Sequence, residues 1–182
     1  MLLKNTVLTL VICLMGFSPS LLADEKPDSA SPQLMSRHLF TLQATVPAAQ
    51  VVPNGPYGKR LYIPVLGGHF KGERLSGEVL PGGADSQLLR HDGVAELDVR
   101  VALKTDDGVI IYMSGLGMRH GPPEVLARIK KGEKVDKSEY YFRESMMFEA
   151  PPGRYEWLNK IIAVAGGERT DKYVLIEFFE IL

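Results

Sequence analysis

The chain has 182 residues, of which 45% are hydrophobic and 24% are charged. This length and mixture are typical of one folded domain, and they exclude a chain that is disordered throughout. Lysine and arginine total 21 and aspartate and glutamate total 22, so the formal net charge is −1. Because nucleic-acid-binding domains are normally basic, we expect no nucleic-acid partner.

Residues 1–23 have the pattern of a secretory signal peptide. Lys4 supplies a positive start, an apolar run extends from Val7 to Met15, and Ala23 is a small residue suited to cleavage. The run is too short to cross a bilayer and no second run follows it, so no stable membrane insertion is expected after cleavage. Cleavage would also remove Cys13, the only cysteine. We therefore predict an exported protein, periplasmic or secreted, with no disulfide.

Residues 24–35 are polar and rich in serine and proline, which predicts a flexible leader before a domain at residues 36–182. Within that domain, short runs alternate between apolar and polar residues, as half-buried strands do. The 18 glycines and 12 prolines exceed the usual combined share of about 12% and indicate many turns. The expected strands, in chain order, are residues 37–46, 59–66, 69–80, 86–91, 94–104, 109–114, 140–143, 146–148, 155–165 and 172–181.

Turn residues show how these strands connect. Asp92-Gly93 and Thr105–Gly108 each separate two alternating runs, which is a strong β-hairpin signal. Gly72 and Gly77 lie inside one run and favour sharp bends, as at a barrel corner. Residues 47–56 are expected to form a loop. The one good helix candidate is residues 123–131, with proline at its start and glycine after its end. Strands in hairpin succession predict an all-β fold, a closed barrel or a sandwich.

Distinctive pieces occur along most of the chain after residue 38. They are Leu97–Arg119, Gly58 with Arg60, Pro64–Gly68, Gly77–Asp85, Arg90 with Asp92-Gly93, Tyr141–Arg143, Phe148-Glu149 and Tyr155–Asn159. As a set they resemble domain-of-unknown-function family 3237, also called uncharacterised protein family UPF 0311. The resemblance implies a single antiparallel β-barrel of calycin-like appearance with no established common activity. Two positions depart from the family pattern, because Ser86 and Val101 stand where the family commonly has an aromatic residue.

Standard catalytic signatures are missing from the sequence. No serine lies in a nucleophile elbow and no glycine-rich segment has phosphate-loop spacing. The four histidines are scattered without metal-ligand spacing, so we expect neither a metal nor a cofactor.

Asp98 and Arg100 lie two residues apart on a predicted strand and therefore share one face. Two interpretations stay open for that face. It is the solvent face if Leu97, Val99 and Val101 pack in the core. It lines a cavity if the barrel has a polar interior and a covered apolar exterior. On the second interpretation, the candidate ligand-binding residues are Arg60, Asp85, Asp98, Arg100, Tyr112, Arg143, Trp157 and Asn159.

Three functions fit this sequence. The first is an exported barrel that binds a small, partly apolar organic ligand, such as one bearing a carboxylate or enolate. The second is a cofactor-independent isomerase, cyclase or hydratase in the same pocket, with Asp98 or Asp85 as the general base. The third is an interaction module that forms a homodimer through a strand edge or an apolar outer face.

Overall fold

The structure is a computed structural model that describes residues 33–170 and 172–182. The predicted signal peptide, Cys13 and most of the predicted leader lie outside the described residues. Residues 34–182 form one compact unit of eleven strands, one α-helix and one 3-10 helix. Neither helix in this described part of the chain has the length and apolar character that a membrane span requires. The elements are β1 Ser36–Thr45, β2 Gln50–Gly55, β3 Gly58–Pro64, β4 Gly67–Lys71, β5 Ser76–Val79, β6 Ala84–Leu89, β7 Ala95–Thr105, β8 Ile110–His120, α1 Pro123–Lys130, β9 Tyr141–Glu149, η1 Glu156–Lys160, β10 Ala163–Arg169 and β11 Tyr173–Ile181.

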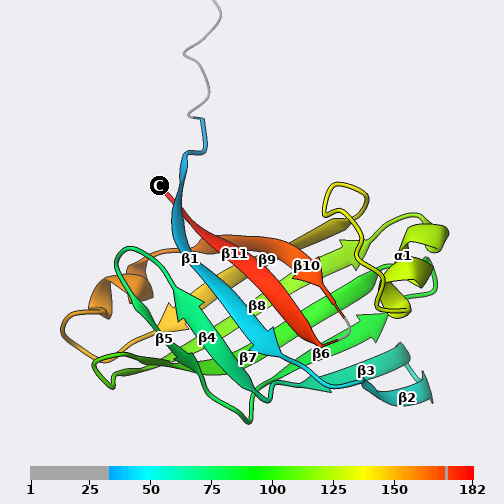
Figure 1. Cartoon of the computed structure of the whole chain (residues 1–182), viewed down its shortest axis with the longest axis horizontal. Helices are drawn as coiled ribbons and strands as arrows, with labels where there is room; N and C mark the ends of the chain where they lie inside the picture. The colour runs from blue at the N-terminus through cyan, green and yellow to red at the C-terminus, as the bar shows by residue number, and fades with distance from the viewer. Residues whose placement is uncertain (1–32, 171) are drawn as a thin grey trace, which may run out of the picture. The chain divides into compact units, whose positions relative to one another are not determined.

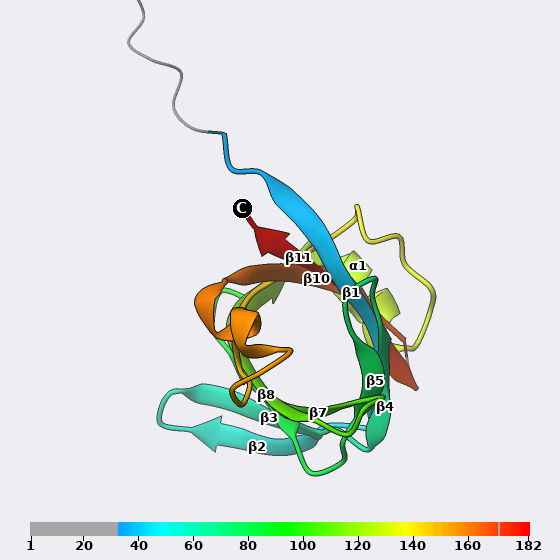
Figure 2. The same ribbon diagram turned by 90° about the vertical axis from the view of Figure 1, so that its left-hand side faces the viewer.

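Eight of the strands close into an antiparallel barrel (Figure 2). Their order around the ring is β1, β4, β5, β7, β8, β9, β10 and β11, and β1 closes the ring by pairing with β11. The remaining three strands extend the sheet outward from the first half of β7, in the order β6, β3 and β2. The expected single antiparallel barrel with one short helix is confirmed.

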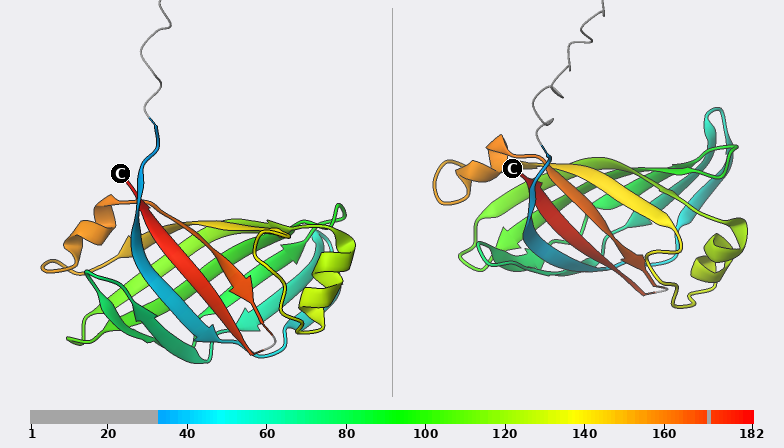
Figure 3. Two further views of the ribbon diagram at one scale, coloured as in Figure 1. Left: turned by 45° about the horizontal axis from the view of Figure 1, so that its top comes forward. Right: turned by 90° about the horizontal axis from the view of Figure 1, so that it is seen from above.

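The two ends of the barrel are covered differently. Figure 1 shows α1 at one end and η1, in orange, at the opposite end. The β2–β3 hairpin projects at the α1 end (Figure 3). At the η1 end, the Arg74 guanidinium lies 3.8 Å from the centroid of the Trp157 ring and also pairs with the buried Glu180 carboxylate. These contacts hold the η1 segment against the turn between β4 and β5 at that end of the barrel.

The hairpins predicted at Asp92-Gly93 and at Thr105–Gly108 are confirmed. Gly93 and Gly108 have φ values of 85° and 87°, which side chains with a Cβ rarely adopt. Glycine is required at position 77 for a steric reason. A Cβ there would lie 2.1 Å from the carbonyl oxygen of Lys104, so only glycine lets the two strands approach this closely. The predicted helix begins at Pro123, as expected, and ends at Lys130.

Several expected elements differ from the structure. The runs expected at residues 140–143 and 146–148 are one strand, β9, and the run expected at 109–114 continues to His120 in β8. The run at residues 69–80 is two strands, because the chain turns between Lys71 and Ser76. The loop expected at residues 47–56 contains β2, an edge strand that tolerates Pro53 because its outer side has no strand to bond. The strand expected at residues 155–165 begins only at Ala163, since residues 156–160 form the 3-10 helix.

The core fills the barrel between its two ends. Four buried phenylalanines form a cluster, in which the Phe40 ring lies 4.5 Å from the Phe178 ring, 5.3 Å from Phe70 and 6.1 Å from Phe148, measured between centroids. Leu158 of η1 is fully buried. The Phe178 ring of this cluster also lines the open space that remains inside the barrel.

Candidate functional site

A cavity of about 60 Å³ lies inside the barrel. This is space for several water-sized groups, enough for a compact molecule or for the reactive end of a larger one. Most of its lining is aliphatic or aromatic, and only three of the lining side chains, Asp85, Glu144 and Arg169, are polar. The apolar lining consists of Leu42, Ala44, Val46, Ile63, Val65, Val79, Val99, Val101, Met113, Phe142, Met146, Val174, Ile176 and Phe178.

Strand alternation turns Glu144 into the barrel. In β9 the side chains of Phe142, Glu144, Met146 and Phe148 are buried, while those of the intervening residues are exposed. Glu144 is only 3% exposed. A carboxyl group in phase with three buried apolar side chains must enter the core, because a strand cannot turn one residue outward without breaking its pairing.

Two glycines on the neighbouring strand β8 make room for side chains of β9. A Cβ on Gly115 would lie 2.1 Å from the Met146 sulfur, and a Cβ on Gly117 would lie 2.5 Å from Cγ of Glu144. Any larger residue at either position would displace these side chains. The glycines therefore fit Glu144 and Met146 into the barrel.

Asp85 accepts the last of a series of side-chain hydrogen bonds that begins at Arg119. Arg119 donates from Nη2 to Oε1 of Gln87 over 3.1 Å, and Gln87 donates from Nε2 to Oδ2 of Asp85 over 2.5 Å. The second carboxylate oxygen, Asp85 Oδ1, is buried and has no hydrogen-bond partner among the described residues. Since buried polar atoms are nearly always paired, this oxygen is a candidate contact for a bound molecule.

Burial dominates the electrostatics of the cluster. It raises the pKa of Asp85, while the Gln87 hydrogen bond, the charges of Arg119 and Arg169 and the backbone N–H of Asp98 oppose that rise. Burial, aided by the charge of Asp85 and opposed by that of Arg119, raises the pKa of Glu144 to about 8. Glu144 is therefore mostly a neutral acid at pH 7 and can donate a hydrogen bond.

The two arginines are also partly desolvated. Burial lowers the pKa of both Arg119 and Arg169, and the charge of Asp85 opposes this in each case. Arg119 and Arg169 lie at or next to the ends of β8 and β10, and the cluster therefore sits in the half of the barrel near α1. The cavity combines an apolar body with a hydrogen-bond acceptor, a neutral acid and a cation.

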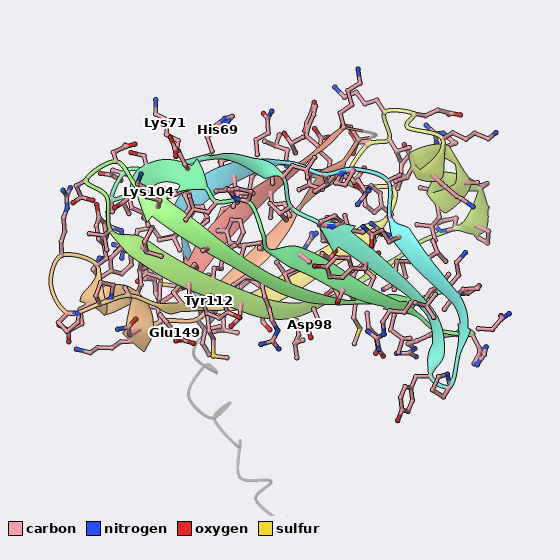
Figure 4. All side chains as sticks on the ribbon, turned by 90° about the horizontal axis from the view of Figure 1, so that it is seen from below. His69, Lys71, Asp98, Lys104, Tyr112 and Glu149 are labelled. Carbon is pink, nitrogen blue, oxygen red and sulfur yellow. The ribbon has the colours of Figure 1, made fainter. Side chains whose placement is uncertain are left out.

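Of the eight residues proposed from the sequence, only Asp85 lines this cavity. Asp98 and Arg100 form an ion pair on the outside, with Nε of Arg100 3.0 Å from Oδ1 of Asp98 and side-chain exposures of 62% and 40% for Arg100 and Asp98. Figure 4 shows Asp98 and Tyr112 on the outer surface of the sheet. The cavity placement of Asp98 and Arg100 is wrong, and the solvent-face interpretation holds.

Arg60, Tyr112 and Arg143 are likewise exposed on the outer face. Tyr141 and Arg143 share a face, as predicted, but it is the face opposite Glu144. Placing these residues at or near a cavity was therefore wrong, because the alternation of β3, β8 and β9 turns their apolar neighbours inward.

Trp157 and Asn159 lie in η1 rather than on a strand, so their two-residue spacing does not place them on one barrel wall. Asn159 accepts a hydrogen bond from the Ala150 N–H over 2.6 Å and donates one to the Ala150 carbonyl over 2.9 Å. Trp157 carries the Arg74 guanidinium over its ring. Both residues anchor η1 at the end of the barrel, and the expectation that they line the cavity is wrong.

The sequence interpretation missed Gln87, Arg119, Glu144 and Arg169. A signal was available for Glu144, which is in phase with Phe142, Met146 and Phe148 on one strand. Among the described residues, no three His, Cys, Asp or Glu side chains come together as a group that could hold a metal ion.

Comparisons with known proteins agree with the family resemblance. The sequence profile of the family described as "Protein of unknown function (DUF3237)" matches residues 35–181. A UPF0311 protein of Rhodopseudomonas palustris is 38% identical over 152 residues, which cover 84% of this chain and 99% of that protein. Its crystal structure is similar to this one with a TM-score of 0.80 and covers 84% of this chain and 100% of that chain.

Two further solved structures share the fold. A β-barrel-like protein of Acinetobacter baumannii is 35% identical with a TM-score of 0.72, covering 85% of this chain and 99% of that one. An enzyme from Penicillium herquei is 17% identical with a TM-score of 0.63, covering 84% and 98%. The profile match and the identity to the Rhodopseudomonas protein together show that the chain belongs to the DUF3237 family.

Proposed function

We propose that this protein binds a small, partly apolar organic ligand inside the barrel. The observation that carries the proposal is Asp85 Oδ1, a buried carboxylate oxygen without a partner on a side chain that lines an otherwise apolar cavity. Leaving such an oxygen unpaired costs about 1–3 kcal/mol, and a ligand hydroxyl or N–H group would remove that cost.

The polar lining defines the chemistry of the ligand. Glu144, as a neutral acid, would donate to a carbonyl or enolate oxygen, and the Arg169 guanidinium would attract a carboxylate or an enolate. The aliphatic lining would contact the apolar body of the ligand. The ligand class that fits is a compact molecule with an apolar portion and one oxygen-bearing end.

A substitution that fills the cavity tests this function. Ala44 is 2% exposed and lines the cavity, so Ala44→Leu would occupy space that the ligand needs. We expect native mass spectrometry of the purified wild type to show a bound small molecule, and we expect Ala44→Leu to lose at least nine-tenths of it.

Ala102→Leu is the matched control, because Ala102 pairs with the outward-facing Tyr112 on the outer side of the barrel. This variant should retain the ligand. Equal ligand content in Ala44→Leu and wild type would contradict binding in the cavity, as would a wild type that binds no small organic molecule from a metabolite extract.

We propose in addition that the protein works outside the cytoplasm. The support is the signal-peptide pattern of residues 1–23, with Lys4 before the apolar run and Ala23 at its end. Mass spectrometry of the protein from its native cells is expected to show a mature chain beginning at Asp24. Ala23→Phe should block that cleavage, and a wild-type chain still beginning at Met1 would contradict export.

A further inference from the structure

Two carboxyl groups enter the cavity from different strands of the sheet. Asp85 is on β6 and Glu144 is on β9, and β7 and β8 lie between them in the sheet. Both line the same cavity, among side chains that are otherwise apolar except for Arg169. Their surroundings differ, because Asp85 is held by the Gln87 amide while no hydrogen bond to the Glu144 side chain is found among the described residues.

We propose that the cavity catalyses a 1,3-proton shift in a small carbonyl compound, with Asp85 as the general base and Glu144 as the general acid. This inference rests on the proposed ligand-binding function, since the substrate occupies the same cavity. The substrate class is a β,γ-unsaturated ketone or another ketone with an enolisable α-hydrogen.

The reaction needs no added reactant. The Asp85 carboxylate removes the α-proton, the C–H electron pair forms a C=C bond, and the carbonyl oxygen takes the Glu144 proton to give a dienol. The Glu144 carboxylate then recovers the enol proton as the carbonyl re-forms, while the γ-carbon takes the proton from Asp85. The product is the conjugated ketone, and both carboxyl groups return to their starting states.

The surroundings of each carboxyl suit its role. Burial raises the pKa of Asp85, and the Gln87 donor, the positive charges of Arg119 and Arg169 and the Asp98 backbone N–H oppose that rise, which favours the ionised form that a base requires. Burial and the nearby Asp85 charge favour the protonated form of Glu144, as an acid requires. Two acids whose environments separate their proton affinities are a recurring arrangement for acid–base catalysis.

The apolar lining supports the same chemistry. It leaves little water to compete for the proton or to solvate the enolate, so the few polar groups act in a medium of low polarity. Arg169 is the cation in the lining and would stabilise negative charge that develops on the carbonyl oxygen.

The test uses 3-cyclopentenone and 3-cyclohexenone with the purified protein. Saturation-transfer NMR measures binding, absorbance of the conjugated enone measures isomerisation, and NMR in D₂O measures deuterium uptake at the α-carbon. We expect isomerisation above the buffer rate, with a 10²–10⁴-fold loss in Asp85→Asn and a 10- to 100-fold loss in Glu144→Gln. Both variants should still bind the ketones within a few-fold of wild type.

Asp98→Asn and Glu149→Gln are the matched controls, because they make the same chemical changes on the outer face (Figure 4). Both should isomerise the ketones at the wild-type rate. The wild-type rate should also fall as pH rises through about 8, where Glu144 loses its proton. The charged groups that act on Glu144 are Asp85 of β6 and Arg119 of β8, and Arg169 of β10 lines the same cavity.

The outcomes separate the two proposals. Binding of the ketones without isomerisation or deuterium uptake would overturn the catalytic inference and leave ligand binding in place. Isomerisation that survives in Asp85→Asn would overturn the assignment of the base. Failure of both ketones to bind would overturn the inference and, for this ligand class, the proposed binding function.

Discussion

The variant Glu144→Gln is expected to lose most of the fall in stability that the wild type shows between about pH 4.5 and pH 8. Glu144 is almost fully buried, and its pKa in the folded protein is raised from 4.5 to about 8, first by burial and then by the charge of Asp85. Glutamine has nearly the same size and no charge, so it removes this ionisation from both the folded and the unfolded chain.

The sign of the effect follows from proton binding in the two states. Below about pH 4.5 the Glu144 carboxyl is protonated in both states, so its ionisation does not change the free energy of unfolding. Between 4.5 and about 8 only the unfolded chain releases the proton, so rising pH favours unfolding. Above about pH 8 the free energy of unfolding stays lower by the full amount, on the order of 4–5 kcal/mol from the difference between the two pKa values.

Urea unfolding at pH 4, 6, 8 and 9 measures this dependence. The free energy of unfolding of the wild type should fall across the series relative to that of Glu144→Gln. Glu149→Gln is the control, since Glu149 is exposed on the same strand. Its curve should run parallel to the wild type. A Glu144→Gln curve that is also parallel would mean that Glu144 is not the buried acid described above.

Much of the fold could be predicted because its signals are local. Asp92-Gly93 and Gly108 fix tight turns that few other residues permit, and the alternating residues on either side of them specify paired strands. The prediction of a strand at residues 155–165 was wrong for the same reason. Its local pattern fits an extended strand, whereas its 3-10 turn depends on contacts with other elements, such as Arg74 over Trp157 and Asn159 on Ala150.

The site was predicted only in part because it depends on which face of each strand is buried. The pairing of Asp98 with Arg100 on one face was correct, yet that face is exposed. Glu144 shares its face with apolar residues. A search for strand faces made up of polar residues therefore does not find it. An ionisable residue in phase with buried apolar ones is the more informative signal, because burial there is enforced by strand geometry.

Local sequence patterns could not show that the polar residues of the site come together in space. Asp85, Arg119, Glu144 and Arg169 lie on four strands and span 85 positions of the chain, and the pairing and curvature of these strands in the barrel bring them near one another. The interaction between the acids and the arginines depends on barrel geometry, which alternation along a single strand does not specify.

Phe178→Ala is expected to lower the free energy of unfolding by about 3–5 kcal/mol, because it removes a fully buried ring and leaves a void. Phe178 is 1% exposed, its ring centroid lies 4.5 Å from that of Phe40, and it lines the cavity. Phe179→Ala is the matched control. Phe179 is the next residue on the same strand, is partly exposed and contacts His38, so its loss should cost no more than about 1 kcal/mol.

The same substitution connects the core to the ligand cavity. Removal of the Phe178 ring would enlarge the cavity by apolar space, and apolar voids of this kind bind benzene. Benzene should therefore raise the melting temperature of Phe178→Ala, since a ligand that binds only the folded state stabilises it by mass action. It should leave that of Phe179→Ala unchanged. Equal melting temperatures for Phe178→Ala with and without benzene would show that the void collapses and that the barrel wall adapts to what fills it.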